Sequence, residues 1–293
     1  MTAATEGWSC WPAPAKINRF LHIVGRREDG YHLLQTVFQL LDWGDDIHLR
    51  TREDGGIRRI DGASDYAVAA DDDLVVRAAR LLHEAAGIGA GVDIRVDKRI
   101  PLGGGFGGGS SDAATVLVAL NALWGAGLSL AELADLGLRL GADVPVFVHG
   151  HTAFAEGVGE KLSPLALPPR WFALVDAGIH VNTAELFGDP KLTRDSPPLK
   201  IGGFLDDDGF EGQDNAFESL VLRRYSRLAS LFDAMRAFGR PRLTGTGGGS
   251  FLVFADREAA EAARRALPEG VRCVLARGLD RSQLHEKIAV KNE

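Results

Sequence analysis

A run of six glycines within seven residues constrains this chain more than any other feature. It lies in residues 101–114, PLGGGFGGGSSDAA, and an alanine-rich helical pattern follows it to about Trp124. Glycine reaches backbone dihedrals that other residues avoid and leaves its N–H groups unshielded, so glycines ahead of a helix suit a polyphosphate held by backbone donors. A flexible linker is the alternative. Linker glycines usually occur among scattered polar residues, whereas here a strand pattern precedes and a helix follows, which favours phosphate binding.

The composition is that of an ordinary globular protein long enough for two domains. Of 293 residues, 45% are hydrophobic and 25% are charged, and 36 are glycine. The net charge is −7 without any basic run, which argues against a nucleic-acid surface and requires local donors for an anionic ligand. Cys10 and Cys273 lack metal-type spacing, and we find no secretory signal and no apolar run of membrane-spanning length. We therefore expect a cytoplasmic protein with no membrane partner.

Hydrophobic periodicity predicts a mixed α+β chain. Strand patterns occur at residues 17–24, 36–41, 92–100, 171–175, near 243, at 251–254 and at 271–276. Helical patterns occur at 73–86, from the glycine loop to about 124, at 129–141, at 215–238 and from about 257, while 143–154 is predicted as strand and turn. Because strands and helices do not alternate strictly, α+β fits better than α/β. Prolines at 164, 168 and 169 predict two domains, 1–165 and 166–293.

The glycine loop formally matches a dinucleotide-binding fingerprint through Gly103, Gly105 and Gly108. Against this, Pro101 separates strand from loop, and Glu132 is only a loose candidate for the acidic residue that the fingerprint needs. The strand before the loop also alternates apolar with charged residues, which predicts one solvated face, as antiparallel sheets allow. No Walker A motif occurs. A wide phosphate loop remains the better interpretation.

Two serines end this loop, and a second glycine cluster lies far along the chain. The hydroxyls of Ser110 and Ser111 could cap the helix, bond a phosphate or touch a magnesium ion. Residues 243–250, LTGTGGGS, lie between two strand patterns. Two such loops suggest one ligand held between the domains, although a hairpin turn would explain the second cluster equally well.

Three further segments carry candidate functional residues. Lys16 and Asn18 lie on one face of an extended strand and could both contact one charged group of a ligand. The alternative is that Lys16 is an ordinary edge-strand lysine, which this spacing does not distinguish. After the turn at Asp29–Gly30, Tyr31 and His32 could stack on and hydrogen-bond a planar base, with surface exposure as the alternative. They follow PAKINRFLHIVGRREDG in the sequence.

Asp143 is the only charge in the apolar run of residues 141–147, GADVPVF. Burying a carboxylate alone is costly, so we expect it either to have a partner or to serve as a turn or cap residue. Lys16 would be the obvious partner, which would place a carboxylate for a substrate hydroxyl beside a cation for phosphoryl charge. This pairing is a hypothesis about distance in space.

Taken together, these segments resemble the small-molecule kinase superfamily of galactokinase, homoserine kinase and mevalonate kinase. The order of the N-terminal strand motif, the central phosphate loop and the C-terminal glycine loop carries the likeness. Within the superfamily, PAKINRFLHIVGRREDGYH, GGGFGGGSS, LGADVPVFVHGHTAFAEGVGE and RLTGTGGGSF resemble the 4-diphosphocytidyl-2-C-methyl-D-erythritol kinase family. The resemblance spans nearly the whole chain and implies a two-domain kinase with its active-site cleft between the domains.

The resemblance also implies a role for each site residue. Lys16 and Asp143 match the family's catalytic pair, and Asn18 would contact the substrate near its phosphate or hydroxyl. Tyr31 and His32 match the cytidine-binding residues, with Phe187 as the opposing stacking face and Thr183 as a polar contact. The ATP loop would comprise Pro101, Leu102, Gly103, Gly104, Gly105, Phe106, Gly107, Gly108, Gly109, Ser110 and Ser111. The implied reaction phosphorylates the 2-hydroxyl of the cytidyl diphosphate substrate from ATP, with Mg²⁺, in the non-mevalonate route to isoprenoid precursors.

Three positions depart from the family pattern. Asp112 replaces the usual asparagine or small residue, and either helps to bind magnesium or points away from the phosphates. Asp73 replaces an asparagine that is common ahead of this helix, which leaves the adenosine contacts there open. Gly247–Gly248–Gly249–Ser250 stands where the family usually has glycine followed by alanine or serine and then cysteine, which leaves the contacts of that loop open. A sibling kinase for another alcohol, a dinucleotide-dependent oxidoreductase and a non-catalytic nucleotide sensor are the alternative functions. The sensor would be expected to lose Lys16 or Asp143, and both are present.

Overall fold

The computed structural model describes residues 7–60, 69, 72–200 and 212–291. Its elements run in the order β1 (Ser9–Arg26), β2 (His32–Arg52), β3 (Ile57–Arg59), α1 (Leu74–Ala86), β4 (Gly91–Asp97), α2 (Gly108–Trp124), α3 (Leu130–Leu138), α4 (Val144–His149), β5 (Ala153–Glu156), β6 (Lys161–Pro164), β7 (Trp171–Asp176), α5 (Thr183–Gly188), α6 (Glu218–Arg224), α7 (Ser226–Met235), the 3₁₀ helix η3 (Arg236–Phe238), β8 (Arg242–Leu243), β9 (Gly249–Phe254), α8 (Arg257–Ala266), β10 (Arg272–Leu279) and α9 (Gln283–Lys291).

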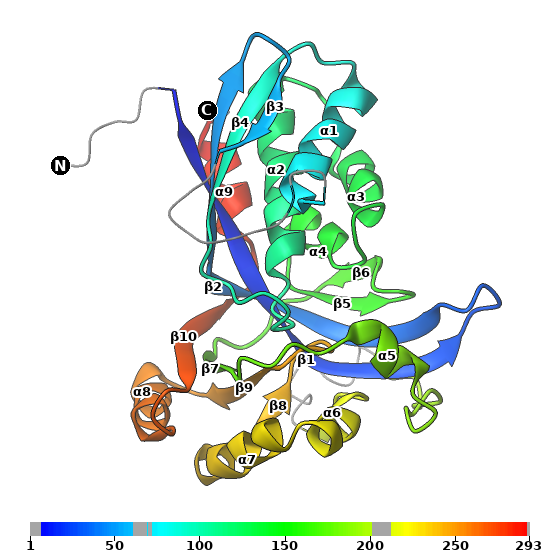
Figure 1. Cartoon of the computed structure of the whole chain (residues 1–293), viewed down its shortest axis with the longest axis vertical. Coiled ribbons are helices and arrows are strands. Elements are labelled where there is room, and N and C mark those ends of the chain that lie inside the picture. The colour runs from blue at the N-terminus through cyan, green and yellow to red at the C-terminus, as the bar shows by residue number, and fades with distance from the viewer. Residues whose placement is uncertain (1–6, 61–68, 70–71, 201–211, 292–293) are drawn as a thin grey trace.

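One mixed sheet runs through the molecule, and the long antiparallel pair β1 and β2 connects its upper and lower parts (Figure 1). The strand order is β3-β4-β2-β10-β7-β9-β8, with β1 paired to β2 and the β5–β6 hairpin also joined to β2. In Figure 1, α1 to α4 gather beside the upper part of the sheet, whereas α6, α7 and α8 lie with β7 to β10 below. The α+β class predicted from the sequence is confirmed.

Separate hydrophobic clusters stabilise the two parts. One packs α1 to α4 against β2 and β4, and another packs α5 to α7 against β7 and β9. Strand β1 contributes to both, because Trp11 lies in the upper cluster and Ile23 in the lower one. The domain boundary predicted at residue 165 falls between β6 and β7 and stays a prediction. Among the described residues, no helix combines the length and the apolar character needed to cross a bilayer.

Helix boundaries agree with the sequence where a capping residue marks them. Asp73 accepts a hydrogen bond from the Val75 amide at the start of α1, and Gly87 ends that helix in the left-handed conformation. Ser129 and Glu132 form both halves of a capping box on α3. That helix ends at Leu138 rather than at the predicted Gly141. These ends are fixed by local side-chain and backbone chemistry, which the sequence displays directly.

Two helical segments differ from the predictions. The segment predicted as strand and turn at 143–154 contains helix α4, whose apolar run is buried and which Gly150 ends in the left-handed conformation. A short buried apolar run cannot be assigned to helix or strand by its period alone. The single helix predicted at 215–238 is instead α6 and α7, separated at Tyr225, whose ψ of 89° is not helical. Helix α5 lies between residues 175 and 215, where the sequence patterns indicate neither helix nor strand.

The prediction of a solvated face on the strand before the glycine loop is wrong for Asp93. Its carboxylate is fully buried and lies 2.7 Å from Arg50 Nη2 and 3.0 Å from Arg52 Nη1. Strand β4 lies inside the sheet, antiparallel to β2 and parallel to β3, so the arginines of β2 cover the charged face. A buried carboxylate needs such partners because desolvation alone disfavours its charge.

Candidate active site

The structure brings Lys16 and Asp143 together, although 127 positions separate them in the sequence, the difference between 143 and 16. Lys16 Nζ lies 3.1 Å from Asp143 Oδ2. The lysine side chain is almost fully buried, with 3% exposed, whereas the aspartate side chain is 35% exposed. A cation held inside the protein beside a partly open carboxylate can act on a reactant that approaches from solvent.

Strand β1 positions the lysine, and its neighbour Asn18 orients it. The Lys16 amide donates to the Phe106 carbonyl over 3.0 Å, which joins β1 to the glycine loop. Lys16 Nζ donates to Asn18 Oδ1 over 2.7 Å, and Asn18 Nδ2 donates to Thr36 Oγ1 over 2.9 Å. The Asn18 side-chain amide is buried and paired through both its oxygen and its nitrogen, so it is placed to hold Lys16. Its predicted contact with the substrate stays a prediction.

The predicted phosphate loop is a bare backbone turn that packs against the second glycine cluster. Gly103, Gly105 and Gly107 all have positive φ, at 71°, 77° and 76°, a region that other residues rarely adopt. A Cβ atom on Gly247 would lie 2.3 Å from the Gly103 carbonyl oxygen, and one on Gly249 would lie 2.1 Å from that of Gly104. The close approach of these backbones requires glycine on both sides. The departure at residues 247–250 from the family pattern is thus compatible with tight loop packing.

The side chains of the predicted ATP loop differ in their exposure to solvent. Phe106 is buried in the core between the two parts, while Leu102 is exposed. The Ser111 hydroxyl donates to the Pro14 carbonyl over 2.6 Å, and its amide donates to the Gly107 carbonyl. This hydroxyl is therefore engaged inside the protein, and the role of Ser111 in binding ATP stays a prediction. Ser110 is half-buried whereas Ser111 is buried, so Ser110 is the serine of the pair that retains exposed surface.

The structure settles where Asp112 and Asp73 point. Asp112 turns into the interior, where Lys98 Nζ lies 2.5 Å from its Oδ2, so it points away from a ligand on the loop. Burial raises the pKa of Asp112, and the neighbouring Lys98 ammonium opposes this rise by favouring the charged carboxylate. Asp73 caps α1, and its Oδ2 lies 2.7 Å from Arg59 Nη1. Both replacements therefore have charge partners inside the protein.

The residues predicted to bind a base gather at one end of the β1–β2 pair. The rings of His32 and Phe187 lie 4.9 Å apart at 30°, which leaves no room for a base between these two, whereas Tyr31 is 65% exposed. Arg194 Nε donates to His32 Nε2 over 3.1 Å. Burial, followed by Arg194 and Arg26, lowers the pKa of His32. The neutral ring then carries its proton on Nδ1.

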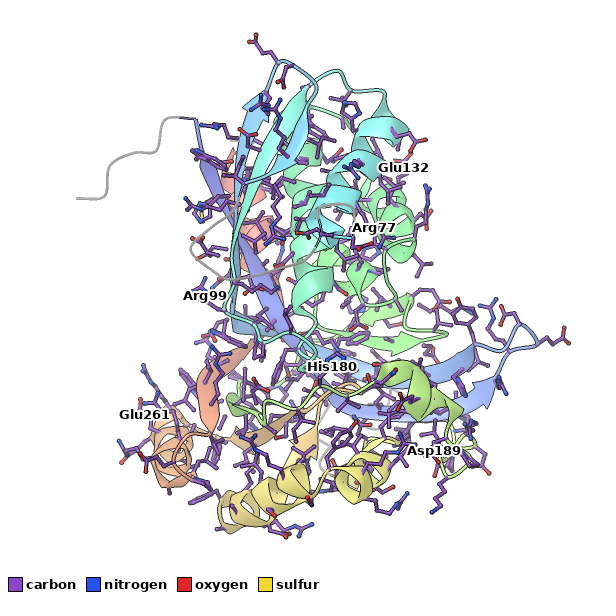
Figure 2. The ribbon with its side chains drawn as sticks, viewed as in Figure 1. Arg77, Arg99, Glu132, His180, Asp189 and Glu261 are labelled. Carbon is purple, nitrogen blue, oxygen red and sulfur yellow. The ribbon has the colours of Figure 1, made fainter. Side chains whose placement is uncertain are left out.

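Sequence reasoning missed the residues that connect these groups. Thr244 Oγ1 accepts from the backbone N–H of Asn18 over 3.0 Å and donates to the Gly105 carbonyl over 3.2 Å. Thr244 therefore links β1 to both glycine loops. Thr246, which was also missed, pairs through its hydroxyl with the predicted Thr183 at 2.6 Å. The position of the labelled His180 beside the phosphate loop can be followed in Figure 2, and a Cβ on Gly103 would lie 2.9 Å from its Nδ1. The threonines of the second glycine cluster were the only available signal.

Two family models match separate segments of the chain, and each segment contributes a loop to this site. Residues 73–151 match the N-terminal domain of the GHMP kinases, and residues 205–273 match the GHMP kinase C-terminal domain. The first match contains the glycine loop and Asp143, and the second contains the 243–250 loop.

Relatives resemble the chain over nearly its whole length. It is 60% identical over 284 residues to the 4-diphosphocytidyl-2-C-methyl-D-erythritol kinase of Xanthomonas axonopodis pv. citri (strain 306), covering 97% of this chain and 95% of the relative. The enzyme of that name from Xylella fastidiosa (strain 9a5c) is 58% identical over 278 residues, covering 95% and 92%. A crystal structure of 4-(cytidine 5'-diphospho)-2C-methyl-D-erythritol kinase aligns with TM-score 0.75 and 35% identity over 92% of this chain and 99% of that one. Homoserine kinase from Cytophaga hutchinsonii aligns with TM-score 0.70, 16% identity and coverage of 97% and 98%, which shows the shared fold.

Proposed function

The chain belongs to the 4-diphosphocytidyl-2-C-methyl-D-erythritol kinase family of the GHMP kinases, and from this we propose that it phosphorylates the 2-hydroxyl of that cytidyl substrate with ATP. The products are the 2-phosphate and ADP, on the non-mevalonate route to isoprenoid precursors. The observation that carries the proposal is the contact of 3.1 Å between Lys16 Nζ and Asp143 Oδ2 beside the glycine loop. Phosphoryl transfer depends mainly on positioning and electrostatic stabilisation, and this arrangement offers both.

In the proposed reaction, Asp143 acts on the acceptor and Lys16 on the transferred group. The 2-hydroxyl oxygen forms a bond to the γ-phosphorus while the bond from that phosphorus to the bridging oxygen of ADP breaks. Asp143, whose carboxylate is partly open to solvent, orients the hydroxyl and receives its proton. Lys16 faces the charge that spreads over the γ-phosphoryl oxygens. Asn18 keeps the Lys16 ammonium in place through the contact of 2.7 Å.

The glycine loop would hold the ATP phosphates with backbone amides ahead of helix α2, and Mg²⁺ fits the same place. The described residues contain no cluster of three His, Cys, Asp or Glu side chains with metal-binding geometry. An ion beside the glycine loop would be held mainly by phosphate oxygens and water, as Mg²⁺ usually is in kinase sites. The Ser110 hydroxyl, at the start of α2, would offer one oxygen ligand to the ion. When bound, Mg²⁺ neutralises charge on the β- and γ-phosphates.

For the cytidyl end, we propose that Tyr31 stacks on the base and that His32 reads its polar edge. Tyr31 presents an exposed ring, and Phe187 lies in contact with His32 nearby. The proton on His32 Nδ1 can be donated to an acceptor of the cytosine edge, since Arg194 occupies Nε2. Thr183 begins helix α5, which carries Phe187, and supplies a polar group on this side.

An acceptor panel tests the substrate. ATP consumption is measured with the diphosphocytidyl compound, homoserine, galactose and mevalonate at equal concentrations. We expect ADP formation with the cytidyl compound alone, because only that acceptor offers a base to Tyr31 and His32. Turnover of another alcohol, with none for the cytidyl compound, would replace the proposed substrate by that of a sibling kinase.

Replacing Tyr31 with alanine is expected to raise the KM for the cytidyl substrate about tenfold or more, since base–aromatic stacking is worth roughly 1–3 kcal/mol per base. The kcat and the KM for ATP should change little, because Tyr31 touches neither the acceptor hydroxyl nor the glycine loop in this arrangement. Steady-state kinetics with each substrate varied in turn measure this. Tyr31→Phe keeps the ring and serves as the control. An unchanged KM in Tyr31→Ala would remove Tyr31 from base binding.

A further inference from the structure

A buried lysine lies between two aspartates directly beneath the glycine loop. Lys98 Nζ is 2.7 Å from Asp45 Oδ2 and 2.5 Å from Asp112 Oδ2, and all three side chains are buried. The other oxygen of Asp112, Oδ1, is buried and has no hydrogen-bond partner among the described residues. Lys98 is therefore the group that holds the Asp112 carboxylate in place.

This triad of Asp45, Lys98 and Asp112 joins three segments that the sequence keeps apart. Asp45 belongs to β2, Lys98 follows β4, and Asp112 lies in the first turns of α2. Asp45 Oδ1 also accepts from the amides of Arg99 and Ile100, over 2.5 and 2.8 Å. The connection that leads into the glycine loop, marked by Arg99 in Figure 2, is thus bound to the sheet by one carboxylate.

The lysine also touches the loop itself. A Cβ atom on Gly108, the first residue of α2, would lie 3.0 Å from Lys98 Nζ and 2.9 Å from a methyl group of Ile100. The ammonium group therefore lies close to the backbone of the residue that follows Gly107, the N-cap of α2. A shift of the triad would move the amides at this helix terminus.

We propose that Lys98, held between Asp45 and Asp112, is a positioning residue that fixes the glycine loop and the first turn of α2 in the shape that binds ATP. The inference rests on the proposed function and deepens it. Lys98 acts through the backbone of residues 108–112 and through the strands that it joins. Small displacements of a positioning group can change reactivity strongly, since a misplacement of about 1 Å can cost roughly a hundredfold.

A variant that preserves packing separates this role from stability. Replacing a buried ion pair by apolar residues of similar volume is often neutral or stabilising, whereas removal of one partner is destabilising. The triple variant Lys98→Met/Asp112→Leu/Asp45→Asn removes all three charges together and should therefore fold, and the amide oxygen introduced at position 45 can still accept from the two backbone amides. We expect its Kd for a non-hydrolysable ATP analogue to rise about tenfold, with the KM for the cytidyl substrate within about twofold of wild type. Calorimetric titration and steady-state kinetics measure the two constants.

Two single variants complete the design. Asp112→Asn keeps an acceptor for Lys98 and should bind the analogue within about twofold of wild type, as rescue by the conservative change requires. Asp93→Asn disturbs a comparable buried cluster with Arg50 and Arg52. It should lower the Tm without changing the Kd.

The proposal is overturned if the triple variant binds the analogue as wild type does, or if Asp93→Asn weakens binding equally. A triple variant that does not fold would also overturn it, because the triad would then be needed for folding as such. Failure of the wild-type protein to bind the analogue would instead reject the proposed function.

Discussion

Replacing Asp143 with asparagine is expected to lower kcat about a thousandfold, within the range that general acid–base groups contribute. Asparagine keeps the shape of the side chain and can still bond Lys16, but it cannot receive the proton of the acceptor hydroxyl. ATP binding should survive, because the contacts proposed for the phosphates come from the glycine loop. Rapid-quench measurement of phosphoryl transfer, together with titration of an ATP analogue, measures both properties.

Asp97 provides a matched control for this variant. Its carboxylate is 45% exposed and lies 2.9 Å from His48 Nε2 and 3.3 Å from Arg95 Nε, so it resembles Asp143 in being a partly exposed carboxylate beside a basic side chain. Asp97→Asn should leave kcat unchanged. Retention of near-normal kcat in Asp143→Asn would remove Asp143 from the mechanism.

Replacing Gly105 with alanine should strongly weaken productive ATP binding. Gly105 has φ of 77°, and an added Cβ would lie 2.2 Å from the Thr244 carbonyl oxygen. The left-handed conformation costs a residue with a Cβ roughly 1–2 kcal/mol, and the overlap forces the two glycine loops apart. Because the loop would no longer present its amides together, we expect the KM for ATP to rise about a hundredfold. Kinetics at varied ATP and analogue titration measure this.

Gly125→Ala is the control for backbone strain alone. Gly125 ends α2 with φ of 64°, and nothing lies within 4 Å of the position of an added Cβ. This variant should lose roughly 1 kcal/mol of stability with no change in the KM for ATP. Equal effects of the two variants would mean that loop contact has no part in nucleotide binding.

Local chemistry made much of the fold predictable. The ends of α1 and α3 depend on Asp73, Gly87 and Ser129, whose capping roles are visible in the sequence. Helix α4 was not predictable in this way, because its apolar run is buried on all sides and shows no helical period. The burial of Asp93 depended on arginines of β2, more than 40 residues earlier.

The candidate site was likewise predictable where local chemistry marks a residue, and not where its role depends on distant residues. Glycine spacing predicted the phosphate loop, and the lone charge in its apolar run marked Asp143 as a residue that needs a partner. Its distance from Lys16 was a hypothesis, which the contact of 3.1 Å supports. The direction of Asp112 was left open because it depends on Lys98, which sequence reasoning did not single out. The role of Thr244 depends on β8 lying beside β1, and no local pattern indicates that.

Identification of the product by ³¹P nuclear magnetic resonance tests the central claim most directly. The enzyme is incubated with ATP, Mg²⁺ and the diphosphocytidyl substrate labelled with ¹³C at the carbon that bears the 2-hydroxyl. The proposed function predicts one new phosphomonoester signal coupled to that carbon, one ADP for each product, and an intact cytidyl diphosphate. Release of inorganic phosphate without a phosphomonoester, or a phosphoryl group on another hydroxyl, would contradict it.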